Sequence, residues 1–121
     1  MFKMNLLMKT VGLMAAATLA TANFANEAEQ PLQIAQLTDG FNAENTYMAS
    51  CFACHSTGAA GAPKVGAGNA AVWEARLEKG MDTIVSNAIN GVNTMPAKGL
   101  CFTCTDEDIR AIVEYMVASS T

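Results

Sequence analysis

The segment Cys51-Phe52-Ala53-Cys54-His55 constrains this chain more than any other part of it. It places two thiols three positions apart and follows them at once with the only histidine among the 121 residues. This is the pattern of a c-type haem attachment site, in which each thiol adds to one vinyl group of the porphyrin and the adjacent imidazole binds the iron. The sequence therefore predicts one haem c, attached covalently through Cys51 and Cys54, with His55 as an axial ligand.

Two other interpretations of the same motif are weaker. A closed zinc site needs four ligands at characteristic spacings, and the chain has no second histidine to contribute. A thioredoxin-like redox pair belongs to a βαβ unit, and that pattern is missing from the sequence. The motif thus favours haem over zinc or a dithiol.

The first 22 residues are typical of a secretory signal peptide. Lys3 and Lys9 lead into an uncharged, alanine-rich apolar run that ends in small residues. We expect cleavage after Ala22, or as a second choice after Ala25, and a mature protein in the periplasm, where disulfides persist. An uncleaved anchor is the alternative, but the run is shorter than the ~20 residues that a spanning helix needs.

The mature chain is expected to be one small acidic domain of about 100 residues. We expect a flexible leader over residues 23–38 and the domain itself over residues 39–121. Removing Lys3 and Lys9 leaves 5 basic residues against 11 acidic ones, so the formal charge changes from −4 to −6. This charge disfavours nucleic acid and anionic lipid as partners, allows at most peripheral membrane contact, and favours a partner with a basic docking surface.

The remaining pattern predicts an all-α domain of about four helices. The final helix is the clearest, because Thr105 and Asp108 form a short version of a capping box. After them, apolar residues recur at helical spacing at positions 109, 112, 113 and 116. The glycine-rich stretch 56–69 is expected to be a loop. The three earlier helices are expected at Phe41–Ala53, with Asp39 as a candidate cap, at Val72–Lys79 and at Thr83–Asn90.

The sixth ligand of the iron cannot be a second histidine, so it is a methionine, a less usual donor or absent. Four of the eight methionines lie in the expected signal peptide, residues 1–22. Three others lie on expected helices or follow a helix end: Met48, Met81 and Met116. Met95 lies in the loop 93–99, where no apolar stripe explains it. The sequence therefore predicts Met95 as the second axial ligand, with plain packing or an open sixth position as alternatives.

A second Cys-x-x-Cys pair, Cys101 and Cys104, is followed by Thr105 where a second haem would need histidine. We therefore expect a single haem. In an oxidising compartment the pair is predicted to form a disulfide, which contributes only about 2 kcal/mol because its loop is so small. Its use would be local, to pin the Met95 loop to the start of the last helix. A redox-active dithiol is the alternative.

The chain resembles the class I c-type cytochromes, and specifically the cytochrome c5 family, over about residues 43–117. The resemblance rests on Cys-Phe-Ala-Cys-His at 51–55, Gly-Ala-Pro-Lys-Val-Gly at 61–66 and Met-Pro-Ala-Lys-Gly at 95–99. The cysteine pair directly before the last helix is its most specific element. The resemblance implies a small cytochrome c fold wrapped around one haem, and a role in electron transport.

The resemblance also implies roles for individual residues. Pro63 would offer its backbone carbonyl to the ring N–H of His55 and so fix the tautomer of the imidazole. Trp73 and Arg76 would line the propionate side of the haem. Ordinary helix packing for Trp73 and a solvated surface charge for Arg76 are equally acceptable.

The same resemblance implies redox partners, and the sequence departs from the family at one position. The partners would be a membrane quinol-oxidising complex and a terminal oxidase or reductase, met by a monomer or weak dimer. Ala43 stands where similar proteins often have glycine, at the crossing of the first and last helices. This methyl group is expected to widen the crossing slightly. Tyr47 and Tyr115 are candidates for the aromatic contact there, with simple core filling as the alternative.

Together these features predict a periplasmic one-electron carrier and not an enzyme. An iron that keeps His55 and Met95 in both oxidation states rearranges little for each electron, and methionine ligation raises its potential. Two alternatives come from other classes of protein. One is a haem enzyme or gas-binding protein with an open sixth position, and the other is a thiol oxidoreductase that uses Cys101 and Cys104.

Overall fold

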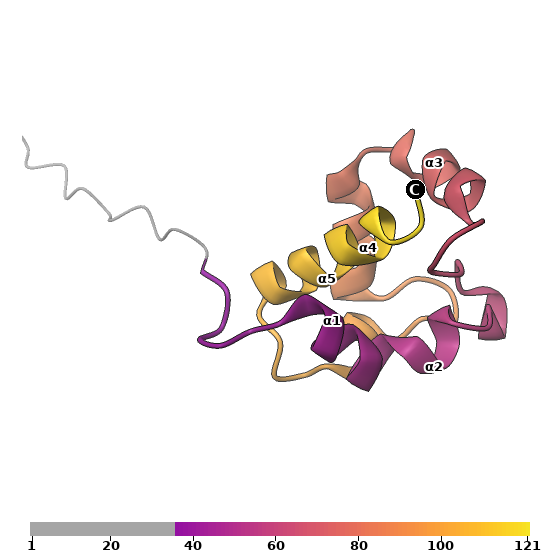
Figure 1. Cartoon of the computed structure of the whole chain (residues 1–121). Helices are drawn as coiled ribbons and strands as arrows, with labels where there is room; N and C mark the ends of the chain where they lie inside the picture. The colour runs from indigo at the N-terminus through magenta and orange to yellow at the C-terminus, as the bar shows by residue number, and fades with distance from the viewer. Residues whose placement is uncertain (1–35) are drawn as a thin grey trace, which may run out of the picture. The chain divides into compact units, whose positions relative to one another are not determined.

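The computed structural model of the chain describes residues 36–121 (Figure 1). The expected signal peptide and most of the expected leader lie outside the described residues. Within residues 36–121, none of the helices has the length and apolar character needed to cross a membrane. The same part of the chain pairs in a strand-like manner only at an isolated bridge between Val92 and Met95. The prediction of an all-α domain is confirmed.

The first helical stretch, residues 43–55, is continuous but not uniform. It consists of α1 (Ala43–Thr46), a π-helical turn η1 (Tyr47–Cys51) and α2 (Phe52–His55). In the turn, the backbone N–H of Phe52 donates to the carbonyl of Tyr47, five residues back. Because neighbouring residues on an α-helix are about 100° apart, the wider turn rotates every later side chain about the axis. His55 therefore points in a different direction than it would at the end of an uninterrupted α-helix.

The N-cap of the helical stretch is Asn42, so the expectation of Asp39 as its cap is wrong. The side-chain oxygen of Asn42 accepts a hydrogen bond from the backbone N–H of Asn45 at 2.8 Å. Asp39 is exposed and lies in the preceding turn, where the N–H of Phe41 donates to the carbonyl of Thr38. Asparagine and aspartate cap helices about equally well, so the residue types did not separate the two positions.

The middle of the domain is a loop followed by two helices. The loop 56–69 contains only one short 3-10 turn, η2 (Ala59–Gly61). It leads to α3 (Ala70–Leu77) and α4 (Met81–Asn90), each of which starts two residues earlier than expected. Gly80 separates these helices with a φ of 87°, a conformation that glycine adopts without strain.

The last helix, α5 (Asp106–Ala118), follows a 3-10 turn η3 (Ala97–Leu100) and has the cap that the sequence predicts. The N–H of Asp108 donates to Oγ1 of Thr105 at 3.1 Å, and the N–H of Thr105 donates to the Asp108 carboxylate at 2.9 Å. The four apolar residues of the predicted stripe are all buried: Ile109, Ile112, Val113 and Met116. With 43–55 counted as one stretch, the described residues form four helices, as expected.

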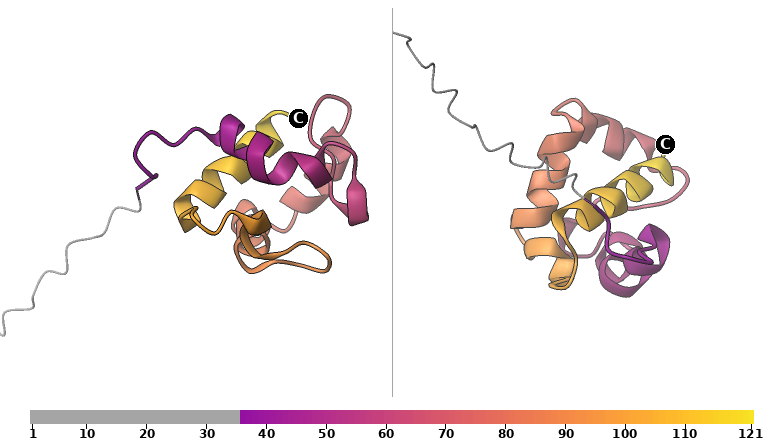
Figure 2. Two further views of the ribbon diagram at one scale, coloured as in Figure 1. Left: turned by 90° about the horizontal axis from the view of Figure 1, so that it is seen from below. Right: turned by 90° about the vertical axis from the view of Figure 1, so that its left-hand side faces the viewer.

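α5 lies at the centre of the domain, in contact with both α1 and α4 (Figures 1 and 2). The rings of Tyr47 and Tyr115 meet between the first helical stretch and α5, with centroids 5.6 Å apart, which confirms the expected aromatic contact. Just beyond the C-terminus of α5, Oγ of Ser120 accepts a hydrogen bond from the N–H of Gly66 at 3.1 Å. These contacts fix α5 against the helix and the loop that flank the attachment motif.

Candidate functional site

His55 is the last residue of α2, and its ring is held in one orientation. It is buried, and its Nδ1 lies 2.8 Å from the carbonyl oxygen of Pro63. Because the carbonyl can only accept, Nδ1–H donates, and a neutral ring then keeps its free lone pair on Nε2. Burial lowers the pKa of His55, although the hydrogen bond to Pro63 opposes this effect; the charge of Arg76 lowers the pKa further. The site therefore favours a neutral imidazole, the form that binds metals.

The two thiols of the attachment motif differ in exposure. Cys51 is half-buried and Cys54 is exposed, and they are not bonded to each other. Burial, with a smaller contribution from Cys54, raises the pKa of the Cys51 thiol to about 11. Such a thiol is protonated at neutral pH, unlike the thiolates of redox enzymes and zinc sites. The environment of Cys51 therefore does not resemble that of a catalytic cysteine.

A cavity lies between the attachment motif, the Met95 loop and α5. Its wall is mainly apolar and joins parts of the chain that are far apart in the sequence. Nine residues line it: Cys51, His55, Ala88, Met95, Lys98, Ile109, Ile112, Val113 and Met116. The predicted apolar stripe of α5 thus has a role that its spacing did not reveal, since the same four side chains that fill the core form one wall of the site.

Met95 is brought to the cavity by a tight turn. Its N–H and carbonyl both bond to Val92, at 2.9 and 3.1 Å, and Asn93 takes a positive φ of 53° within the turn. Gly91 lies against this turn, and a Cβ there would come within 2.8 Å of the Met95 carbonyl oxygen. On the other side of the turn, Oγ1 of Thr94 donates to the carbonyl of Ala60 at 2.8 Å. The turn is therefore fixed to the loop that follows His55.

The other described methionines have different surroundings. Met48 is 53% exposed on the first helical stretch. Met81 is half-buried at the start of α4. Met116 is buried on α5 and lines the cavity together with Met95. Met116 is thus the methionine whose surroundings most resemble those of Met95.

Trp73 and Arg76 both lie on α3. Trp73 is only 2% exposed, and its indole N–H donates to the carbonyl of Lys64 at 2.7 Å. Arg76 is half-buried and donates from Nη1 to the carbonyl of Val72 in its own helix at 2.7 Å. The contacts of Trp73 are those of a packed core residue. The charge of Arg76, in contrast, contributes to the lowered pKa of His55.

Cys101 and Cys104 are joined by a disulfide bond in the structure, and both are buried. They lie between the Met95 loop and the N-terminus of α5. Their loop is closed further by the N–H of Cys104, which donates to the carbonyl of Cys101 at 3.0 Å. The position is the one that the sequence suggests, at the junction of the Met95 loop with the last helix.

The donor set and the cavity fit a c-type haem. Two thiols that are not bonded to each other lie beside an imidazole whose Nδ1 is occupied by Pro63. A thioether from a separate loop reaches the same apolar cavity. Groups of at least three His, Cys, Asp or Glu residues that could hold a bare metal ion do not occur among residues 36–121. The chemistry of the site is therefore that of an apolar macrocycle with an imidazole and a thioether, not that of a zinc centre.

Comparisons with known proteins agree with this chemistry. Residues 38–116 match the family model described as "Cytochrome C oxidase, cbb3-type, subunit III". Cytochrome c5 of Ectopseudomonas mendocina is 39% identical over 77 residues, which are 62% of this chain and 86% of that protein.

Two solved structures share the fold. A mono-heme ferrocytochrome c from Shewanella putrefaciens is 46% identical and matches with a TM-score of 0.58, over 70% of this chain and 99% of its own. One chain of the electron transfer complex of nitrite reductase with cytochrome c is 31% identical, also with a TM-score of 0.58. That match covers 64% of this chain and 91% of the other.

The fold, the attachment motif and these similarities define a class I c-type cytochrome, a small electron-transfer protein and not an enzyme. Within this class the chain belongs to the cytochrome c5 family. Its cofactor is one covalently bound haem c.

Proposed function

We propose that the chain is a periplasmic one-electron carrier in which His55 and Met95 are the two axial ligands of the haem iron. Cys51 and Cys54 attach the ring in this proposal. The observation that carries it is that His55 and Met95, from two separate segments, line the same apolar cavity. When bound, the haem supplies an iron that gains and loses one electron.

The chain's own residues support this role in three ways. The carbonyl of Pro63 accepts from Nδ1 of His55 and leaves Nε2 free to bind. The turn from Val92 to Met95 and its contact with Ala60 hold the thioether in place. The buried stripe of α5 keeps water from the apolar side of the cavity. A ligand set held this firmly changes little between oxidation states, which suits electron transfer.

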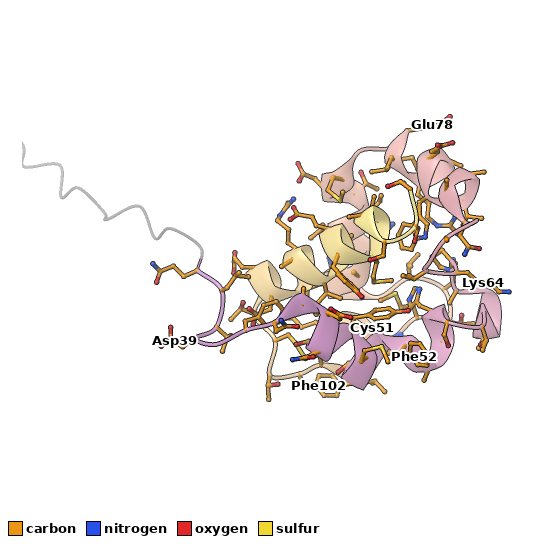
Figure 3. All side chains as sticks on the ribbon, in the orientation of Figure 1. Asp39, Cys51, Phe52, Lys64, Glu78 and Phe102 are labelled. Carbon is orange, nitrogen blue, oxygen red and sulfur yellow. A yellow bond between two sulfur atoms is a disulfide. The ribbon has the colours of Figure 1, made fainter. Side chains whose placement is uncertain are left out.

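The surface around the attachment motif offers a docking face for redox partners. Four large apolar side chains are exposed on the helix that carries the motif and on the segment that follows Met95: Met48, Phe52, Leu100 and Phe102. Figure 3 shows Phe52 and Phe102 on the lower side of the view, below Cys51. An apolar face on an acidic protein suits a small, transient encounter with a partner that has a basic rim. We assign the partners to a quinol-oxidising complex and a terminal oxidase or reductase.

The location and the cysteine pair belong to the same proposal. The basic and apolar signal peptide expected over residues 1–22 supports export, with the folded domain beginning near residue 39. Two hydrogen bonds from Thr38 to Asp108 support a domain that begins near this residue. In the periplasm the disulfide of Cys101 and Cys104 would be stable, and its burial suits a structural rather than a redox role.

The test is carbon monoxide binding by the purified ferrous protein. The proposal expects the wild type to stay low-spin and refuse carbon monoxide, and a Met95→Ala variant to bind it rapidly. Met48→Ala is the matched control, because Met48 is exposed, and it should behave as the wild type does. Rapid binding by the wild type, with peroxidase turnover, would replace the carrier by a haem enzyme or gas-binding protein.

A further inference from the structure

Three successive residues in the segment after Met95 have a left-handed backbone. Lys98, Gly99 and Leu100 have φ values of 54°, 57° and 70°. Glycine adopts this conformation without strain, but lysine and leucine rarely do. A strained run of this kind persists only where the surrounding structure holds it. The structure must therefore contain a contact that keeps this segment in place.

The side chain of Lys98 makes that contact. Its Nζ donates to the carbonyl of Cys104 at 3.0 Å and pairs with the carboxylate of Asp106 at 2.8 Å. The Lys98 side chain is 26% exposed and the Asp106 side chain 57%, so water and salt reach the ion pair mainly from the side of Asp106. Cys104 closes the disulfide loop, and Asp106 is the first residue of α5. The lysine therefore spans from the Met95 segment to the last helix.

The backbone of the same residue completes a closed loop of contacts. The carbonyl of Lys98 accepts from the N–H of Cys101 at 3.0 Å, and the N–H of Gly99 donates to the carbonyl of Pro96. Lys98 also lines the cavity that Met95 and His55 share. A Cβ on Gly99 would lie 3.8 Å from Sγ of Cys51, so this segment runs close to the attachment motif. A shift of the segment would therefore move residues that line the cavity.

We propose that Lys98 is a positioning residue for Met95, and that its ammonium group clamps the strained segment 98–100 against the entry to α5. The inference rests on the proposed ligation of the iron by Met95. The clamp fixes the segment that follows Met95 in the chain. The residue before Met95, Thr94, is fixed by the hydrogen bond from its hydroxyl to the carbonyl of Ala60. With both sides fixed, the thioether stays directed at the cavity.

The experiment compares the holoprotein with Lys98→Met, which keeps the length and loses the charge, and with Lys79→Met, an exposed lysine, as the matched control. Two measurements are made, the first on the ferrous form and the second on the ferric form. One is hydrogen exchange of the Gly99 and Cys101 amides by NMR. The other is the intensity, during heating, of the weak far-red band that reports a bond from methionine sulfur to iron.

In Lys98→Met, exchange of both amides is expected to be about tenfold faster or more, because a charge-assisted hydrogen bond is lost. The far-red band is expected to fade well below the unfolding temperature. Lys79→Met should change neither. Asp106→Asn removes the ion pair but keeps the bond to Cys104, so it should give a smaller acceleration, and it serves if Lys98→Met does not fold. Lys98→Arg should restore the wild-type behaviour in part.

The outcomes separate this inference from the proposed function. Equal exchange rates in Lys98→Met and Lys79→Met overturn the clamp, whatever binds the iron. Faster exchange with a far-red band that survives to the unfolding temperature shows a clamp that does not position Met95, and also overturns the inference. A wild type whose far-red band is missing, or persists in Met95→Ala, overturns the ligation itself.

Discussion

The carboxylate of Asp108 holds Thr38 by two hydrogen bonds across 70 residues of sequence, at 2.9 Å to its N–H and 2.6 Å to its hydroxyl. Asp108 is only 1% exposed, and its carboxylate also completes the capping box with Thr105. One side chain therefore joins the start of the folded domain to the first turn of α5. Because α5 forms a wall of the haem cavity, this junction supports the site from outside.

We predict a pH-dependent contribution of Asp108 to stability. Burial raises its pKa, but the hydrogen bonds from Thr38 and Thr105 lower it, and the net direction is down. A pKa below the unfolded value of ~3.9 stabilises the fold above that pH, and the stabilisation is lost as the pH falls through the lowered pKa. Asp108→Asn should therefore unfold about 1–2 kcal/mol more easily than the wild type near neutral pH, with a deficit that shrinks in acid.

Denaturant unfolding of the holoprotein over a series of pH values measures this effect. Asp39→Asn is the matched control, since Asp39 is exposed on the same segment as Thr38. It should follow the wild type at every pH. A deficit in Asp108→Asn that remains constant down to the most acidic pH would contradict the charge-based account.

The second prediction separates packing from haem contact at Trp73. Trp73→Phe removes the hydrogen bond from the indole to Lys64, in a side chain that is almost fully buried. The variant should lose about 1–3 kcal/mol of stability, with a reduction potential close to that of the wild type. Thermal unfolding and redox titration provide the two measurements. A marked change in potential without loss of stability would instead favour a propionate contact.

The third prediction concerns the disulfide. Replacing both Cys101 and Cys104 by alanine should cost about 2 kcal/mol on the chain-entropy account, while haem attachment and the reduction potential are retained. In the wild type, burial of both sulfur atoms should protect the disulfide from a mild thiol reductant until the protein unfolds. Thiol labelling under native conditions checks this. Fast, reversible reduction of the folded protein would support the alternative function of a thiol oxidoreductase.

The features that the sequence predicted well are those with local signals. The attachment motif is five consecutive residues, and the cap of α5 is read from Thr105 and Asp108 within one turn. The burial of the α5 stripe follows from its spacing of three and four residues. In these cases the interacting groups are neighbours in the chain, so residue type and spacing are sufficient.

The features that were missed leave no signal in residue type and spacing. Asp108 was expected only as part of a cap, but it also bonds to Thr38. The π-helical turn at 47–51 lies in a segment whose pattern reads as an ordinary α-helix. The left-handed backbone at Lys98 and Leu100 is contrary to the preference of both residue types. The Thr38 bonds span 70 residues, and the residue types at the other two places favour a different backbone, so no short pattern contains any of the three.

The most direct test of the central claim is an NMR measurement of the methionine methyl groups in the ferrous holoprotein. An iron-bound methionine holds its methyl over the porphyrin, where the ring current shifts its resonance far from those of ordinary methionines. The account predicts one such resonance, which disappears in Met95→Leu and persists in Met116→Leu. A shifted methyl that persists in Met95→Leu, or one that belongs to Met116, would contradict it.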